Sequence, residues 1–130
     1  MIDPKDELVS KEIKNIGSYK PENIRTYGKL VKPGGTILSV GSHVGLAAIV
    51  YTKIAGPNAK LFIIEPYSVS YKLASQNVYT NDLALVSTLY RKAASNRTGR
   101  GELLINLDDT SAALLAQDGS KASVPRLVER

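Results

Sequence analysis

The sequence predicts an α/β protein with a parallel sheet core and a C-terminal β extension. Three observations favour this class. Apolar runs at 36–40, 60–65 and 86–90 have the length and composition of buried strands. Stretches with helical patterning separate these runs, as connections between parallel strands require. A glycine loop follows the first run at 41–45, and Glu65 closes the second. This order is typical of sheets that bind a ligand at one end of their strands.

The segment before the first strand is predicted to be helical. A first helix is expected over 5–16 and is ended by Gly17. Its apolar residues recur on one face: Leu8, Val9, Ile13 and Ile16. A second short helix is expected over 21–30, because Pro21 suits the first turn of a helix.

The elements of the core follow in order. The strand at 36–40 is apolar and β-branched, so it is expected to be buried on both faces. Residues 46–55 are small and apolar nearly all round, which indicates a helix pressed against a sheet. A further helix, capped by Ser68 or Ser70, is expected to run to about Asp82, with its inward side formed by Val69, Leu73 and Val78. Right-handed crossovers then place the first strand at a switch point, with room for a ligand beyond its carboxyl end.

The remainder of the chain has a different character. A turn-rich stretch at 95–101 leads to a short strand at 102–106, which indicates a β-hairpin or extension. Residues 107–130 are predicted to be a poorly patterned tail. We therefore expect one domain of 130 residues, with a helical segment at 1–32 before an α/β core at 36–106.

Composition narrows the possible functions. The 43% hydrophobic and 22% charged content is ordinary for a globular protein. There is no cysteine, which excludes disulfides and thiolate metal sites, and a single histidine, His43, excludes a site with several histidines. No metal is predicted. The N-terminal residues lack a signal-peptide pattern and no apolar run is long enough to span a bilayer, so a cytoplasmic protein without a membrane partner is expected.

The formal net charge of +5 raises the alternative of a nucleic-acid-binding protein. The lysines and arginines are scattered, however, and no aromatic-rich nucleic-acid motif accompanies them. A solvated basic surface is the favoured interpretation, and nucleic acid is an unlikely partner.

The glycine loop indicates which small molecule is bound. Gly41 and Gly45 form G-x-x-x-G, which lacks the middle glycine that a dinucleotide pyrophosphate needs, so a nicotinamide-dependent enzyme is disfavoured. The phosphate-loop motif also fails, because no Gly-Lys-Ser/Thr follows. An adenosine ligand without phosphate, S-adenosylmethionine, fits better, and the Glu65 carboxylate suits its two ribose hydroxyls. The alternatives are a strand-to-helix turn that simply needs glycine and a glutamate at a solvated strand end.

Four blocks together carry a resemblance. They read V-G-S-H-V-G at 40–45, F-I-I-E-P-Y at 62–67, L-A-S-Q-N-V-Y-T-N-D-L at 73–83 and R-K-A-A-S-N-R-T-G-R-G-E-L at 91–103. Over about residues 36–115 the chain resembles the FkbM-type family of class I S-adenosylmethionine-dependent methyltransferases. That family shows D-x-G-A-N-x-G, F-E-P, L-x-x-N-x-x-x-N and an alanine pair before a glycine turn, in this order. The resemblance implies an incomplete Rossmann-like class I methyltransferase fold.

The resemblance also implies roles for individual residues. The methionine part of the cofactor would be surrounded by Gly41, Ser42, His43 and Gly45. Glu65 would hold the ribose hydroxyls, while Pro66 and Tyr67 would border the adenosine. Capping and turn hydrogen bonds are expected from Asn77 and Asn81, and packing near the adenine edge from Ala93 and Ala94.

The chain departs from the family pattern at several points. Ser39 stands where an aspartate is usual, and His43 stands where asparagine is usual. For His43 a local hydrogen bond in the loop is favoured over a catalytic role. The resemblance implies a fourth strand with a K-I-D-V-E-G-like segment, which does not occur before Arg130. The chain is therefore expected to carry the cofactor half of the fold and little of the acceptor half.

Two functions follow as hypotheses. The first is methyl transfer from S-adenosylmethionine to an oxygen or nitrogen acceptor, with no catalytic base assigned; Asp108 and Asp109 are available acids, but solvation is their favoured role. The second is a truncated or degenerate non-catalytic module that binds S-adenosylmethionine weakly or not at all. A half-sheet would expose the edge of its first strand, so self-association, or a partner that completes the sheet, is expected.

Overall fold

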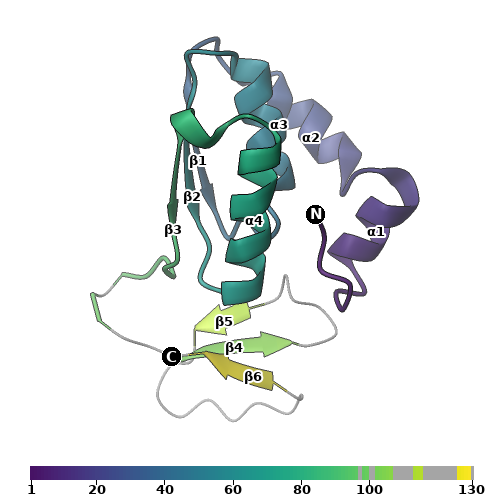
Figure 1. Cartoon of the computed structure of the whole chain (residues 1–130), viewed down its shortest axis with the longest axis vertical. Helices are drawn as coiled ribbons and strands as arrows, with labels where there is room; N and C mark the ends of the chain where they lie inside the picture. The colour runs from purple at the N-terminus through teal and green to yellow at the C-terminus, as the bar shows by residue number, and fades with distance from the viewer. Residues whose placement is uncertain (97, 100–101, 107–112, 116–125, 130) are drawn as a thin grey trace.

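The computed structural model describes residues 1–96, 98–99, 102–106, 113–115 and 126–129 (Figure 1). Helices and strands alternate through most of this chain, as the α/β class requires. The helical elements are α1 (Val9–Ile16), α2 (Pro21–Gly28), α3 (Leu46–Ala55), α4 (Ser68–Thr80) and the short 3-10 helix η1 (Ala84–Val86). The strands are β1 (Thr36–Val40), β2 (Lys60–Ile64), β3 (Ser87–Tyr90), β4 (Leu103–Asn106), β5 (Ala113–Leu115) and β6 (Arg126–Glu129).

The first three strands form a parallel sheet in the order β1-β2-β3. Helices α3 and α4 pack side by side on one face of it, and α2 packs against α3 (Figure 1). The core lies between sheet and helices, where Leu61 and Ile63 of β2 meet Ala48 and Ile49 of α3 and Val78 of α4. The predicted α/β class with a parallel sheet is confirmed.

The opposite face of this sheet carries apolar side chains that are open to solvent. Leu38 and Val40 of β1 are 63% and 55% exposed, and Tyr90 of β3 is also exposed. The prediction that β1 is buried on both faces is therefore wrong, because α3 and α4 cover only the face that bears Ile37. Strand β1 also forms an edge of the sheet, so among the described strands it does not mark a switch point.

The N-terminal helices differ from expectation in their details. Helix α1 begins at Val9 rather than at residue 5, and Leu8 and Ile16 of its predicted apolar face are exposed. The reason is that the carboxylate of Asp6 accepts hydrogen bonds from the backbone N–H groups of Leu8 and Ser10, and so holds the preceding residues outside the helix. Helix α2 begins at Pro21 as predicted.

Helix α4 buries a more polar side than the sequence indicates. Val69 is exposed, whereas Ser70, Ala74 and Asn77 are buried together with Val78. Small and polar residues occupy these positions because α4 approaches the glycine loop closely, as described below. The inward position predicted for Val69 is therefore wrong.

A second sheet follows the core. Its strands are antiparallel in the order β5-β4-β6, and β4 begins within the predicted extension. Leu103 and Ile105 of β4 are buried against Tyr67, which joins this sheet to the start of α4. Strands β5 and β6 lie within the stretch for which only a poorly patterned tail is predicted, because three or four residues give too short a pattern to recognise. Among the residues described, no helix is both long and apolar enough for a membrane crossing.

Candidate functional site

The glycine loop leaves the carboxyl end of β1 through Gly41. The backbone N–H of Gly41 donates to the carbonyl oxygen of Ile64 at 2.9 Å, which extends the pairing of β1 with β2 by one residue. Its φ is +67°, in the left-handed region that side chains disfavour. A Cβ added at Gly41 would meet no atom within 4 Å. The position therefore needs glycine for its backbone, and it leaves open space beside the strand end.

Gly45 ends the loop, and its backbone also favours glycine. Its φ is +82°, and a Cβ added there would lie 3.4 Å from the Cβ of Ala74 in α4. The neighbour of this glycine is therefore helix α4. The loop thus lies next to α4 where α3 begins.

Glu65 lies directly after β2 and is 5% exposed. Its Oε2 accepts a hydrogen bond from the backbone N–H of His43 at 2.8 Å, and its Oε1 accepts one from the N–H of Tyr67 at 3.0 Å. A carboxylate that accepts from backbone N–H groups makes comparatively strong hydrogen bonds. The structure therefore brings together the two predicted features, the glycine loop and the strand-terminal acid, and Glu65 ties one to the other.

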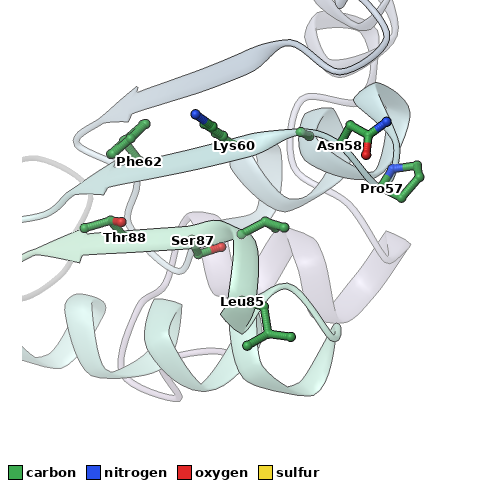
Figure 2. A pocket seen from close by; sticks show the side chains of 9 residues that line it. Pro57, Asn58, Lys60, Phe62, Leu85, Ser87 and Thr88 are labelled. Atoms are coloured by element: carbon green, nitrogen blue, oxygen red, sulfur yellow. The ribbon is translucent and has the colours of Figure 1, made fainter.

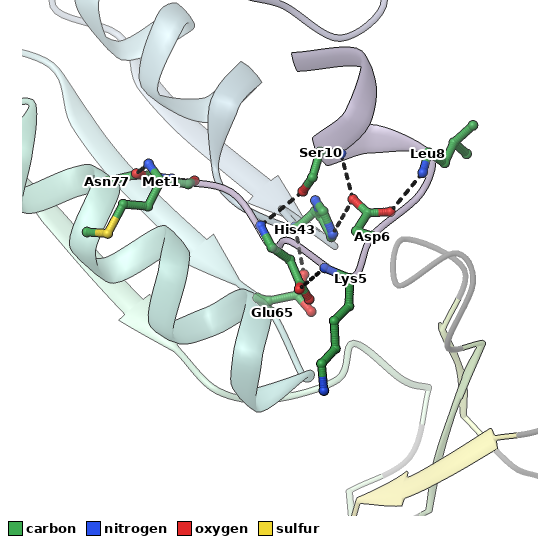
Figure 3. Close-up of polar contacts among 9 residues, drawn as sticks. Met1, Lys5, Asp6, Leu8, Ser10, His43, Glu65 and Asn77 are labelled. Carbon is green, nitrogen blue, oxygen red and sulfur yellow. Dashed lines mark hydrogen bonds and ion pairs between the residues drawn. The ribbon is translucent and has the colours of Figure 1, made fainter. Parts of the chain in front are cut away.

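His43 occupies the middle of the loop and is buried. Its φ is +51°, a region that histidine adopts more readily than most side chains do. Its ring Nε2 lies 3.6 Å from Oδ2 of Asp6, an ion-pair distance when the imidazole is protonated. Figure 3 shows the ring directed at the N-terminal segment. This ring contact is with a residue far away in the sequence.

The N-terminal segment is the part of this site that sequence reasoning missed. Asp3 and Asp6 are 4% and 2% exposed, although both are charged residues close to the start of the chain. The backbone N–H of Asp3 donates to Oγ of Ser10, and the N–H of Lys5 donates to Oδ1 of Asp3. An aspartate just before a helix is a signal for a cap. That signal at Asp6 could have shown that the segment is not part of α1.

Asn77 connects this segment to the loop. Its Nδ2 donates to the carbonyl oxygens of Val44 at 2.9 Å and of Met1 at 2.8 Å, and its Oδ1 accepts from the nitrogen of Met1. Asn81, in contrast, donates to the carbonyl oxygen of Asn77 within its own helix end. Of the two predicted capping asparagines, Asn81 caps its helix, whereas Asn77 joins three separate segments.

The remaining predicted site residues have these positions. Tyr67 is buried against β4, and Pro66 is partly buried between it and Glu65. Ser42 Oγ donates to the carbonyl oxygen of Ser39 at 3.2 Å, which closes the first turn of the loop. Ala93 is partly buried and Ala94 exposed. Asp108 and Asp109 lie outside the described residues.

Two shallow hollows lie away from the glycine loop. One, of about 380 Å³, is at the amino ends of β2 and β3; Figure 2 shows Lys60, Phe62 and Thr88 on its strands and Leu85 at its rim. The other lies at the start of α4, beside Lys72 and Arg91. Neither contains a residue predicted for cofactor binding. In the part of the chain that is described, no group of three or more histidine, aspartate or glutamate residues could hold a metal ion.

Comparison with known proteins places the fold but not a family. No protein-family model and no curated protein matches the chain. A crystal structure of a protein proposed to be an rRNA-methylase, from Clostridium thermocellum, is similar with a TM-score of 0.53 and 15% identity, over 56% of this chain and 39% of that one. A SAM dependent methyltransferase from Aquifex aeolicus is similar with a TM-score of 0.48 and 22% identity, over 64% and 43%.

The chain spans less than half the length of either of these proteins. At such low identity the likeness concerns the fold alone. The fold is α/β with a three-stranded parallel sheet, and it matches part of the class I methyltransferase fold.

Proposed function

We propose that this chain binds S-adenosylmethionine at the glycine loop and Glu65. The observation that carries the proposal is the hydrogen bond from the loop N–H of His43 to Oε2 of Glu65, which holds a carboxylate beside the open backbone at Gly41. This is where a ligand with an amino acid tail and a ribose would need polar partners. The methyltransferase-like fold supports the same ligand.

The proposed cofactor site consists of residues after β1 and after β2. Gly41, Ser42, His43 and Gly45 border the methionine part, Glu65 binds the ribose hydroxyls, and Pro66 and Tyr67 border the adenosine. The four sequence blocks support placing the chain in the FkbM-type family. In that case the reaction is methyl transfer to an oxygen or nitrogen acceptor, in which holding the two reactants in line supplies most of the rate enhancement. A cytoplasmic location is part of this proposal.

Calorimetric titration with S-adenosylmethionine and with its demethylated product tests the site. Glu65→Ala is expected to weaken binding by about tenfold to a hundredfold, because a buried hydrogen-bonding carboxylate is lost. Glu22→Ala, which removes an exposed acid from the first turn of α2, is the control and is expected to bind as wild type does. Absence of heat with both ligands, in a wild-type protein with a cooperative thermal transition, would refute the cofactor assignment.

A second candidate function, a self-associating structural module, is favoured by a different observation. β1 is an edge strand whose outer face exposes Leu38 and Val40, and exposed apolar strand edges promote pairing between chains. Ser39 in place of the usual aspartate supports a module of this kind. We propose that a second copy of the chain covers this face; a partner that completes the sheet is the other outcome.

Sedimentation of point variants tests the self-association. Val40→Lys is expected to convert an oligomer to a monomer, because it places a charge on the exposed strand face, at the carboxyl end of β1. Leu30→Lys, at a 74% exposed leucine after α2, is the control and should keep the wild-type mass. A wild-type monomer at micromolar concentration would contradict self-association, and recovery of an oligomer only with a second protein would identify the partner alternative.

A further inference from the structure

Residues 1–10, which we call the N-terminal strap, lie across the glycine loop. Figure 3 shows the strap running from Asn77 past His43 to the start of α1. One end is held by Asn77, which bonds both Met1 and Val44. The middle is held where Asp6 meets the ring of His43. The strap is therefore attached to α4 on one side of the loop and to the loop itself.

The strap and Glu65 hold His43 from two sides. The backbone N–H of His43 bonds to Glu65, while its ring faces Asp6. In this arrangement both oxygens of Glu65 accept hydrogen bonds from backbone N–H groups, and the side chain is almost completely buried. A ribose can bind Glu65 only if the carboxylate becomes accessible. The conformation described here is thus a closed one with respect to the proposed ligand.

The contacts that hold the strap are mostly polar. Asp3, Asp6 and Ser10 are buried, and Val9 is the one apolar residue of the strap that is fully buried. Burying a carboxylate carries a desolvation cost, which is recovered when the group returns to water. Opening the strap would therefore expose little apolar surface and would rehydrate two carboxylates. Segments with few buried apolar contacts open at low free-energy cost.

We propose that the N-terminal strap is an autoinhibitory cover, which must move away from the glycine loop before a ligand reaches Glu65. This inference rests on the proposed function for the identity of the ligand. The strap competes with the ligand because the closed state binds none, so the apparent affinity is reduced by the fraction of molecules that are open. Weakening the contact between Asp6 and His43 raises that fraction.

The test compares Asp6→Asn with Glu7→Gln. Asp6→Asn removes the charge that faces His43 and keeps the shape of the side chain. Glu7→Gln makes the same chemical change at the next residue, whose exposed carboxylate pairs with Lys11 on the surface. Hydrogen exchange of the ligand-free proteins is measured first. Asp6→Asn is expected to speed exchange of strap and loop amides by about three- to tenfold, and Glu7→Gln to leave it at the wild-type rate.

Asp6 also accepts hydrogen bonds from Leu8 and Ser10 at the start of α1, so a second variant separates its two roles. His43→Asn removes the ring and leaves intact the hydrogen bonds that Asp6 accepts from the backbone N–H groups of Leu8 and Ser10. Asparagine tolerates the positive φ of this position. His43→Asn should therefore speed strap exchange as Asp6→Asn does, without loss of α1 helicity. Unchanged strap exchange in both variants would overturn the proposal, whatever the ligand result.

Titration with the demethylated product of S-adenosylmethionine completes the test. Asp6→Asn is expected to bind about three- to tenfold tighter than wild type, with Glu7→Gln equal to wild type. Equal or weaker binding by Asp6→Asn, when wild type binds, overturns the autoinhibitory role. If neither wild type nor either variant binds, while the strap amides of Asp6→Asn exchange faster, the cofactor assignment is refuted and a strap that can open is supported. Hydrogen exchange thus tests whether the strap opens, and the titration tests the identity of the ligand.

Discussion

The carboxyl end of the parallel sheet and its uncovered face invert the usual distribution of polar and apolar groups. At the carboxyl end, Glu65, Asp3 and Asp6 are buried. On the uncovered face, Leu38 and Val40 are exposed to solvent. Buried acids need specific partners, whereas exposed apolar residues gain from any cover. The first region is therefore specified by hydrogen bonds within this chain, whereas the second presents apolar surface to which another molecule can bind.

The largest expected effect is a difference in stability between two leucine-to-alanine variants, one on each face of the sheet. Leu61→Ala removes a fully buried side chain between sheet and helices and is expected to lower the free energy of unfolding by about 2–5 kcal/mol. Leu38→Ala, on the open face of the neighbouring strand, should change it by no more than about 0.5 kcal/mol. Urea denaturation of both variants at low protein concentration measures the difference. A large loss in Leu38→Ala would show that the open face is covered.

The second prediction concerns Asn77, near the polar carboxyl end of the sheet. Asn77→Ala leaves the carbonyl oxygens of Val44 and Met1 without this donor and is expected to cost about 1–3 kcal/mol. Asn81→Ala is the matched control, because its side chain donates to the carbonyl oxygen of Asn77 within its own helix end, and about 0.5–1 kcal/mol is expected. Equal losses in the two variants, measured by urea denaturation, would contradict the bridging role of Asn77.

The smallest effect concerns Tyr51 on α3, away from both regions. Burial, and secondarily the charge of Tyr27, raises the pKa of the Tyr51 hydroxyl above 10.0. The unfolded chain therefore ionises first, and the stability that neutral Tyr51 contributes is present below pH 10.0 and is lost as the pH rises through the folded pKa. In Tyr51→Phe, the urea midpoint of unfolding should therefore fall less steeply with pH above pH 10.0 than it does in wild type. Tyr79→Phe, at an exposed tyrosine on α4, is the matched control, and an unchanged slope in Tyr51→Phe would contradict the assignment.

The sequence predicts the core elements well because their patterns are local. The bounds of β1 and α3 agree with prediction, since glycine and proline mark the turns around them. The adjacency of the glycine loop and Glu65 follows from the parallel order of β1 and β2. The predictions that are wrong concern features that depend on residues distant in the sequence. The exposed face of β1 depends on which elements cover the sheet, and an apolar strand pattern contains no information on that.

The prediction for the N-terminal segment is wrong for a related reason. Leu8, Val9, Ile13 and Ile16 fit one helical face, and this periodicity hides the capping role of Asp6. The contacts of Asn77 with Met1 and Val44 join residues 76 and 33 positions apart, which no local pattern indicates. Site residues brought together by neighbouring parallel strands were thus predictable, and those brought by the strap were not.

The positive φ of His43 restricts what can replace it. Besides glycine, asparagine, aspartate and histidine are the residues that adopt this backbone conformation most readily. An exchange between asparagine and histidine would therefore keep the loop backbone, while only histidine supplies an imidazole that meets Asp6. Substitution at this one position could therefore create or remove a link between the N-terminal residues and the loop without altering the loop's path.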